Sequence, residues 1–208
     1  MVITLRLEGP LQSWGDHSKL NYRDTTSFPT KSGVIGLIAC CMGLHRGNER
    51  IPKISESLEM AVRADRKGTI MVDYQNVGRT VQADGKETDR TLQTWRGYIQ
   101  DASFYVVLEG DEALLDEISE ALRHPVWMPY LGRKSCPVSV PVLAEKKDCS
   151  LLEAINDADS FAKRHDDVIY YEITSSAGTW KNDIPVDRVR CLEPKYERRR
   201  VQTFKVNY

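Results

Sequence analysis

Two short segments carry the residue types that bind phosphate. One is Tyr130-Leu131-Gly132-Arg133-Lys134-Ser135-Cys136-Pro137, and the other is Pro29-Thr30-Lys31-Ser32-Gly33-Val34-Ile35-Gly36. Glycine lets the backbone approach a ligand closely, arginine and lysine supply positive charge, and serine supplies a hydrogen-bond donor. Each segment alone is a weak signal. Together, in a chain that shows no convincing catalytic constellation, they predict binding of a phosphate-bearing polymer.

The segment from Pro29 also predicts a helix start. Thr30 is a suitable N-cap, apolar residues follow at helical spacing, and Gly43 is a reasonable stop. The free N–H groups of a first helical turn can hold a phosphate, although the residue order of a Walker A loop is absent. The alternative is that Gly33 and Gly36 only permit tight helix–sheet packing.

The other candidate side chains have two interpretations as well. Arg133 and Lys134 either contact phosphate or ribose, or they are ordinary surface charges. In the polar loop from Leu11 to Phe28, an exposed Trp14 or Tyr22 beside Arg23 could stack on a splayed base. The alternative is that Trp14 pins this loop to the core.

Composition restricts the class of protein. A chain of 208 residues with 41% apolar residues forms one large domain, or one domain and a small appendage. With a net charge of −1, nucleic-acid binding requires the cations to gather on one face. Five cysteines without a CxxC pair indicate a reduced, cytoplasmic protein. No membrane contact, cofactor or metal is expected.

The order of predicted elements indicates an α+β fold with a ferredoxin-like βαββαβ core. Strands are expected at Val2 to Leu7, Tyr98 to Leu108 and Val138 to Leu143, helices from Thr30 and at Ala113 to Leu122, a hairpin at Leu58 to Arg66 and Thr69 to Tyr74 that turns at Lys67-Gly68, and a long polar insertion at Gln75 to Arg96. We expect a domain at residues 1–147 and a small β-rich extension at residues 148–208. In this extension we expect a short helix near Leu151 to Phe161 and strands near Val168 to Ile173, Val186 to Leu192 and Arg198 to Val206.

Four ordered segments carry a family resemblance. Leu11-Gln12-Ser13-Trp14-Gly15, Asp73-Tyr74-Gln75 and the two phosphate-type segments resemble the Cas-five family of the RAMP superfamily, in the branch found in type I-E CRISPR Cascade complexes. The resemblance implies a ferredoxin-like core with a long β-hairpin thumb, here at about residues 75–96. It also implies a non-catalytic subunit that caps the 5′ handle of the CRISPR RNA (crRNA) in antiviral defence.

The same resemblance implies the partners and the RNA-contacting residues. The partners are the crRNA, the backbone and large subunits of Cascade, and target DNA through the assembled complex. We expect the two phosphate-type segments to converge into one cradle for the RNA. The expected RNA-contacting residues are Gln12, Ser13, Trp14, Tyr22, Arg23, Thr30, Lys31, Ser32, Gly33, Arg79, Arg90, Arg96, Gly132, Arg133, Lys134 and Ser135.

Two other functions stay open. A related branch of the family cuts RNA without metal, and such cleavage needs a general base and a general acid. His17 with Lys19 and Tyr22 is the nearest cluster of suitable residues, so a metal-independent endoribonuclease is the alternative. A protein scaffold without RNA contact is a third, weaker option.

Overall fold

The computed structural model describes residues 1–15, 18–81, 84–156, 168–173, 183–188 and 195–205. Its helices are α1 (Lys31–Cys41), α2 (Arg50–Ser57), α3 (Glu112–Arg123) and α4 (Leu151–Ile155). Its strands are β1 (Val2–Glu8), β2 (Leu11–Gln12), β3 (Tyr22–Arg23), β4 (Glu59–Arg66), β5 (Thr69–Val77), β6 (Thr80–Val81), β7 (Glu87–Thr88), β8 (Leu92–Gln100), β9 (Ser103–Glu109), β10 (Leu143–Lys147), β11 (Val168–Ile173), β12 (Asp183–Arg188) and β13 (Lys195–Lys205).

A seven-stranded sheet forms the body of the molecule, in the order β10-β1-β9-β4-β11-β13-β12. Neighbouring strands in this sheet are antiparallel. β4 is the middle strand. It pairs with β9 on one side and with β11 on the other, so the sheet continues into the C-terminal part of the chain. The mixed α+β class predicted from the sequence is confirmed. The domain boundary near residue 147 stays a prediction.

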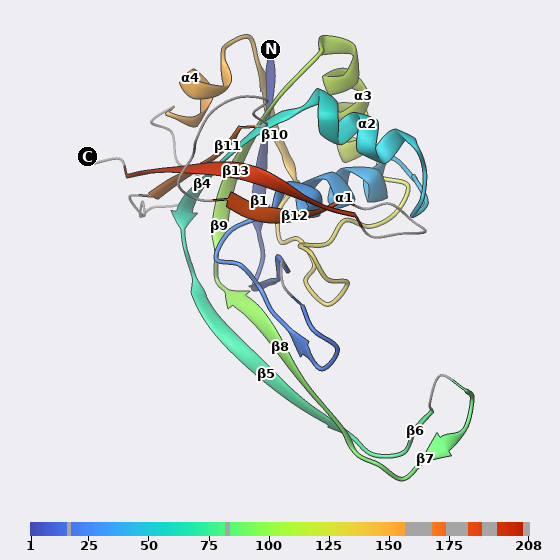
Figure 1. Ribbon diagram of the computed structural model, residues 1–208. Helices are drawn as coiled ribbons and strands as arrows, with labels where there is room; N and C mark the ends of the chain where they lie inside the picture. The colour runs from blue at the N-terminus through green and yellow to red at the C-terminus, as the bar shows by residue number, and fades with distance from the viewer. Residues whose placement is uncertain (16–17, 82–83, 157–167, 174–182, 189–194, 206–208) are drawn as a thin grey trace.

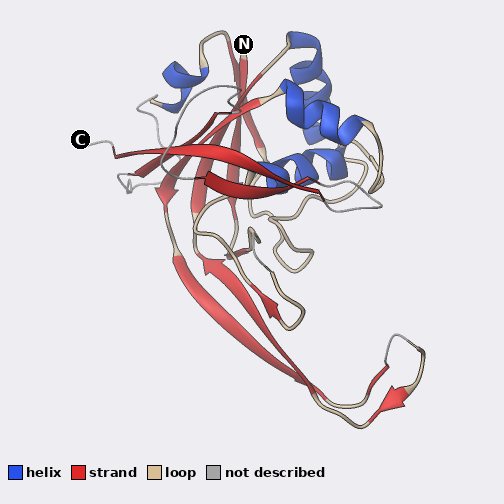
Figure 2. Ribbon diagram, viewed as in Figure 1, coloured by secondary structure: helices blue, strands red, loops and turns tan. Residues whose placement is uncertain are grey.

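Successive side chains of a strand point to opposite faces of the sheet, and the two faces pack in different hydrophobic cores. Ile3, Leu5 and Leu7 of β1 belong to the larger core, on the side of helices α1, α2 and α3. Val2 belongs to a smaller core that includes Leu151 and other apolar residues of α4. Figure 2 shows α1, α2 and α3 grouped together and α4 apart from them.

The helices start where capping residues satisfy their free N–H groups. Thr30 caps α1 as predicted, since its side chain accepts a hydrogen bond from the Gly33 N–H at 3.2 Å. Asp111 caps α3 in the same way, and Ser150 and Glu153 form a capping box at α4. The helix α2, which the sequence pattern did not predict, begins after the polar turn at residues 45–49.

A long hairpin of β5 and β8 extends away from the body, with the short β6–β7 pair near its end (Figure 1). The predicted hairpin turn at Lys67-Gly68 is wrong, because β5 pairs with β8 while β4 pairs with β9. Gly68 has a φ of +70° and Asp101 on the opposite strand a φ of +54°. These two residues bend both strands at the same level, so the chain changes direction without reversing.

The predicted strand at Val138 to Leu143 is also wrong, because β10 begins only at Leu143. Pro137 and Pro141 cannot donate to a ladder, so this stretch follows β1 through separate bonds. The Ser139 N–H donates to the Glu8 carbonyl at 2.9 Å, and the Arg6 N–H donates to the Val142 carbonyl at 2.8 Å.

The C-terminal predictions are met in part. The predicted strand at Val168 to Ile173 is β11, and β12 and β13 lie near the two later ones. The predicted helix at Leu151 to Phe161 begins at α4, but its second half lies outside the described residues.

Candidate nucleic-acid interface

The two phosphate-type segments meet at the indole ring of Trp14. A methyl group added at Gly33 would lie 2.7 Å from the Trp14 Cε3 atom, and one added at Gly132 would lie 3.6 Å from the same atom. Both segments therefore pack against one side chain, although about 100 positions separate them in the sequence. The two segments therefore lie close together, and that they form one cradle for the RNA stays a prediction.

Gly132 owes its identity to this packing. A Cβ atom there would overlap the backbone carbonyl of Ser13, and its φ of +83° disfavours other residues. The Ser13 N–H also donates to the Leu131 carbonyl at 3.0 Å, which ties the loop of residues 11–14 to the loop of residues 131–136. Gly33 is also closely packed, but against the Trp14 ring of a loop and not against the sheet, and a Cβ atom at Gly36 would meet nothing within 4 Å, so the helix–sheet packing alternative is not borne out at Gly36.

Gln12, Ser13 and Trp14 lie inside the molecule. Gln12 donates to the carbonyls of Leu7 and Ala102 and accepts a bond from the Trp14 indole at 3.0 Å. The Ser13 hydroxyl donates to the Gly97 carbonyl at 2.9 Å. Trp14 is only 1% exposed, so the loop-pinning alternative holds and the ring is not an exposed stacking surface. These side chains support the two converging segments from beneath.

The start of α1 is partly available. Lys31, an expected phosphate ligand, is only 2% exposed and belongs to the buried side of the helix. Thr30, Ser32 and Gly33 are half-buried, and the Thr30 and Ser32 hydroxyls lie 3.5 Å apart. The accessible polar groups at this helix start are therefore hydroxyls and backbone, without the lysine charge that the sequence suggested.

The Arg133 side chain lies within the fold. Its Nη2 donates to the Arg23 carbonyl at 3.1 Å and to the Asp24 carbonyl at 3.3 Å. Its guanidinium carbon lies 4.8 Å from the centre of the Tyr98 ring. Arg133 thus holds the segment after β3 against the base of β8, the end of this strand near Tyr98. Neither interpretation of the sequence anticipated this anchoring role.

Lys134 and Ser135 are exposed next to this anchored arginine. Burial raises the pKa of the Cys40 thiol on α1, and the Lys134 charge opposes that rise. Lys134 therefore lies close enough to the last turn of α1 for its charge to act on Cys40. The exposed Lys134 ammonium and the loop backbone therefore lie beside α1.

Tyr22 and Arg23 are exposed on β3, which runs beside β8. In the register of these strands, Arg23 lies next to Arg96 of β8, and Arg96 lies opposite Asp73 of β5. Tyr22 lies next to Trp95 in the adjacent row. The structure thus brings Tyr22, Arg23 and Arg96 together on the inner part of the long hairpin.

Arg79 and Arg90 lie elsewhere. Both are exposed near the β6–β7 end of the long hairpin, far from α1 (Figure 1). Arg79 has a φ of +50°, and the Arg90 N–H donates to the Thr88 hydroxyl at 3.2 Å. These two arginines do not share a site with the converging segments.

The residues of the alternative nuclease cluster are only partly described. Lys19 and Tyr22 exchange backbone hydrogen bonds of 2.7 and 2.9 Å across a tight turn, whereas His17 lies outside the described residues. Within the described part of the chain, no group of three or more histidine, cysteine, aspartate or glutamate residues could hold a metal ion. None of the helices there has the length and apolar character of a transmembrane span.

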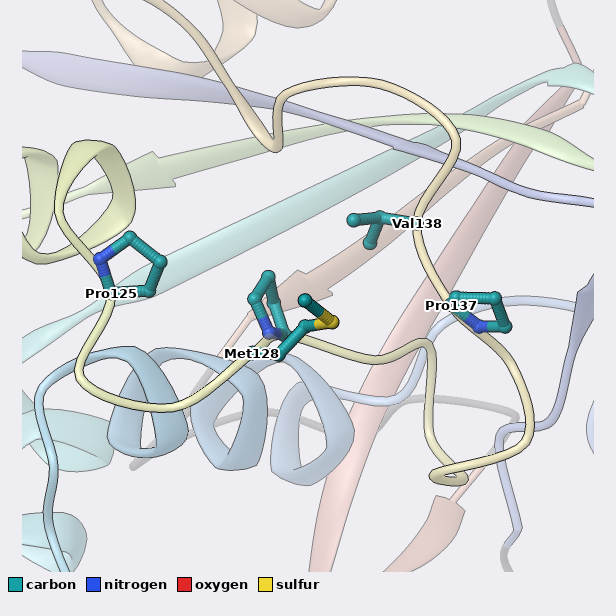
Figure 3. A pocket seen from close by; sticks show the side chains of 5 residues that line it. Pro125, Met128, Pro137 and Val138 are labelled. Atoms are coloured by element: carbon teal, nitrogen blue, oxygen red, sulfur yellow. The ribbon is translucent and has the colours of Figure 1, made fainter.

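A shallow apolar pocket of about 370 Å³ lies beside α1 and is lined by Pro125, Met128, Pro129, Pro137 and Val138 (Figure 3). Its lining contains no titratable side chain, so it offers no acid or base for catalysis. Met128 at its rim is 82% exposed.

Tyr74 and Trp95 are not among the RNA-contacting residues expected from the sequence. They face each other across β5 and β8 with ring centres 5.5 Å apart, and both are substantially exposed. The period-two alternation of the two strands was the available signal, but only the pairing register shows that their side chains share a face.

Comparisons with known proteins agree along most of the chain. The family model described as CRISPR-associated protein (Cas_Cas5) matches residues 2–203. The curated CRISPR system Cascade subunit CasD of Escherichia coli (strain K12) is 37% identical over 153 residues, which cover 67% of this chain and 68% of that protein.

Two solved structures resemble the whole chain. A chain of a structure described as CRISPR RNA-guided surveillance complex has a TM-score of 0.80 and 29% identity, over 99% of this chain and 90% of the other. A structure described as a crystal structure of Cas protein has a TM-score of 0.69 and 28% identity, over 99% and 94% of the two chains.

Proposed function

The chain belongs to the Cas5 family of CRISPR-associated proteins, and from this premise we propose that it is a non-catalytic, RNA-binding subunit of a type I-E Cascade complex. In this role it caps the 5′ handle of the crRNA in the cytoplasm. It also contacts the backbone and large subunits and reaches target DNA through the assembled complex. The similarity to a chain of an RNA-guided surveillance complex supports this assignment.

The strand order supports the family fold. β10, β1, β9 and β4 are neighbours in an antiparallel order, with α1 and α2 between β1 and β4 in the chain and α3 between β9 and β10. A ferredoxin-like βαββαβ core has this arrangement, in which the fourth strand lies beside the first. We assign these elements to that core and the long hairpin of β5 and β8 to the thumb of the family.

The observation that carries the RNA-binding proposal is the convergence around Trp14. Gly33 at the start of α1 and Gly132 lie against the same ring, and the exposed Lys134 follows Gly132 in its loop. Backbone N–H groups at a helix start, hydroxyls and one ammonium form a surface that suits the phosphates of one RNA end. Arg133 anchors the loop, so Lys134 is the cation of this loop that meets the RNA.

A salt titration tests the role of Lys134. The complex is reconstituted from purified subunits and titrated with crRNA between 50 and 200 mM salt, since each phosphate contact contributes about 0.7 to the slope of log affinity against log salt. We expect Lys134→Ala to weaken binding and to reduce the slope by about one contact. Lys53→Ala, at an exposed position of α2, removes the same charge as a control. An unchanged slope and affinity in Lys134→Ala would show that Lys134 contacts no phosphate.

A second assay separates this proposal from the nuclease alternative. The pure protein is incubated with CRISPR repeat RNA in EDTA, and the products are resolved by length. We expect intact RNA. A defined cut that disappears in His17→Ala would overturn the non-catalytic assignment in favour of metal-independent cleavage.

A further inference from the structure

The segment of residues 125–129, Pro125-Val126-Trp127-Met128-Pro129, forms an apolar patch on the surface. Val126 is 63% exposed, Trp127 39% and Met128 82%. Single exposed apolar residues are ordinary, whereas a contiguous group of them marks a site of interaction. The shallow pocket beside α1 adjoins this 125–129 patch, because both prolines and Met128 also line the pocket (Figure 3). The patch therefore has a hollow that an apolar side chain of a ligand can enter.

The backbone of the 125–129 patch is held against the end of α1. The Val126 N–H donates to the Cys41 carbonyl at 2.8 Å, and the Val126 side chain lies over Gly43, where a Cβ atom would be 3.0 Å from it. The Trp127 ring packs on the His45 ring, with 5.0 Å between the ring centres. Proline at each end restricts the backbone further. The exposed side chains are thus presented on a fixed backbone, which reduces the entropy lost on binding.

Positive charge lies on two sides of this patch. Arg123 and His124 end α3, directly before the patch, and both are exposed. Glu120, one turn earlier, lies 3.7 Å from the His124 imidazole, so the carboxylate of α3 nearest to the patch already has a partner. Arg123 therefore provides a cation on this side of the patch.

Lys134 provides the cation on the other side. Its charge acts on the Cys40 thiol, and the Cys40 sulfur lies 3.6 Å from the Met128 carbonyl. Lys134 is itself exposed. The 125–129 patch thus has an apolar centre and a rim that carries positive charge, which is the arrangement of a protein-binding surface with a charge preference.

The side chains of the patch favour a peptide over a nucleic acid as the occupant. Bases of single-stranded nucleic acids stack on exposed aromatic faces. Here the two most exposed side chains, Val126 and Met128, are aliphatic, and the Trp127 ring already packs against His45. Prolines and a flexible methionine around a pocket suit the insertion of an apolar side chain. The cationic rim then selects a segment that carries carboxylates beside that side chain.

We propose that the 125–129 patch binds an acidic peptide segment of a partner protein, with a large apolar side chain of the segment in the pocket and its carboxylates near Arg123 and Lys134. The apolar contact contributes most of the affinity, and the rim charges select and orient the segment. This binding is separate from the proposed RNA binding and does not rest on it. Because Lys134 belongs to both surfaces, an acidic segment docked here would compete with an RNA phosphate for its charge.

A peptide selection on the purified full chain tests the chemistry of the occupant. A library of short random peptides is enriched on the immobilised protein, and the selected peptides are synthesised with a fluorescent label and titrated by anisotropy. We expect peptides that carry a large apolar residue between aspartates or glutamates, and binding that weakens as salt is added. Absence of enrichment, or selected peptides without net negative charge, would overturn the proposal.

Substitutions locate the binding site of the selected peptides. Met128→Ser removes apolar surface from a side chain that is 82% exposed, so it should preserve the fold, and we expect about tenfold weaker binding. Leu152→Ser is the matched control, since it changes a 54% exposed side chain on α4, at the other face of the sheet. Arg123→Gln should weaken binding by about twofold to fivefold at low salt, as a rim ion pair does. Equal affinity of Met128→Ser and the wild type would refute docking at this patch.

Oligouridylate RNA distinguishes a peptide site from a nucleic-acid site. The labelled RNA is titrated into the wild type and into Met128→Ser, and we expect the same result for both proteins. A loss of RNA affinity in Met128→Ser would assign the patch to nucleic acid and overturn the proposal. Failure of the proposed RNA-binding function has a different signature, which is crRNA binding by the complex that Lys134→Ala leaves unchanged.

Discussion

Arg133→Ala should destabilise the folded protein, although Arg133 lies in a loop that the sequence marked for phosphate binding. The guanidinium donates from one nitrogen to the carbonyls of Arg23 and Asp24 and lies over the Tyr98 ring. Alanine removes these contacts together, and it releases the segment after β3 from the base of β8. Lys134, one position further on, is exposed and provides the comparison.

The size of the effect follows from these contacts. A hydrogen bond with a charged partner contributes about 1.5–3 kcal/mol, and an exposed cation–π contact about 0.5–1 kcal/mol. The bond to Asp24 is long at 3.3 Å, and the buried Nη1 has no hydrogen-bond partner among the described residues, which lowers the net gain. We expect a loss of roughly 2 kcal/mol, which corresponds to a fall in Tm of about 4–8 °C for a chain of this size.

Urea and thermal unfolding of the purified variants would measure this loss. Arg133→Ala should unfold at lower urea and at lower temperature than the wild type, whereas Lys134→Ala should stay within about 0.5 kcal/mol, as expected for a surface position. In crRNA binding the order reverses, and Lys134→Ala has the direct effect. If Arg133→Ala melts within about 1 °C of the wild type, the anchoring role of Arg133 is wrong.

Three further predictions concern packing and titration. Gly132→Ala should lower the Tm more than Gly36→Ala in thermal unfolding, because a Cβ atom at Gly132 overlaps the Ser13 carbonyl and one at Gly36 meets open space; equal melting would contradict the packing argument. Burial alone would raise the pKa of Glu8, but hydrogen bonds from Arg6 and Ser103 and the charges of Arg6 and Arg66 lower it below 4.5. The stabilisation from ionised Glu8 is therefore present above pH 4.5 and is lost as the pH falls through the lowered pKa. In urea unfolding, Glu8→Gln should be less stable than the wild type at pH 7 and equally stable in acid. A difference in stability that persists in acid would refute this linkage. Burial raises the pKa of the Cys41 thiol to about 12, so mass spectrometry after alkylation at pH 8 should find Cys41 modified only in unfolded protein, while rapid labelling of the native chain would contradict its burial.

Local patterns in the sequence were sufficient where one element decides its own structure. The alternation of Val2 to Leu7 predicted β1, and Thr30 predicted the start of α1. Those signals depend on neighbouring residues alone, since capping and side-chain period act within one strand or one helical turn. The expectation that two distant segments converge depended instead on the family resemblance, because a family implies a tertiary structure that residue spacing alone does not.

Other features depend on contacts between distant parts of the chain. Lys67-Gly68 has the composition of a hairpin turn, but whether a glycine with positive φ reverses a strand or bends it depends on its partner strand. Gln12 and Trp14 lie in a polar loop, yet they form a buried hydrogen-bonded pair beneath that loop. The role of Arg133 depends on carbonyls more than 100 positions away. Local composition cannot specify such partners.

The alternating rows of the long hairpin restrict how its length can vary. Adding or removing one residue in β5 or β8 would turn every side chain beyond that point to the other side of the ribbon. Charged groups would then occupy the aromatic side, and rings would occupy the charged side. Insertions and deletions should therefore be tolerated in steps of two residues, matched on both strands. In this way the hairpin can become longer or shorter over evolution while each of its sides keeps its chemical character.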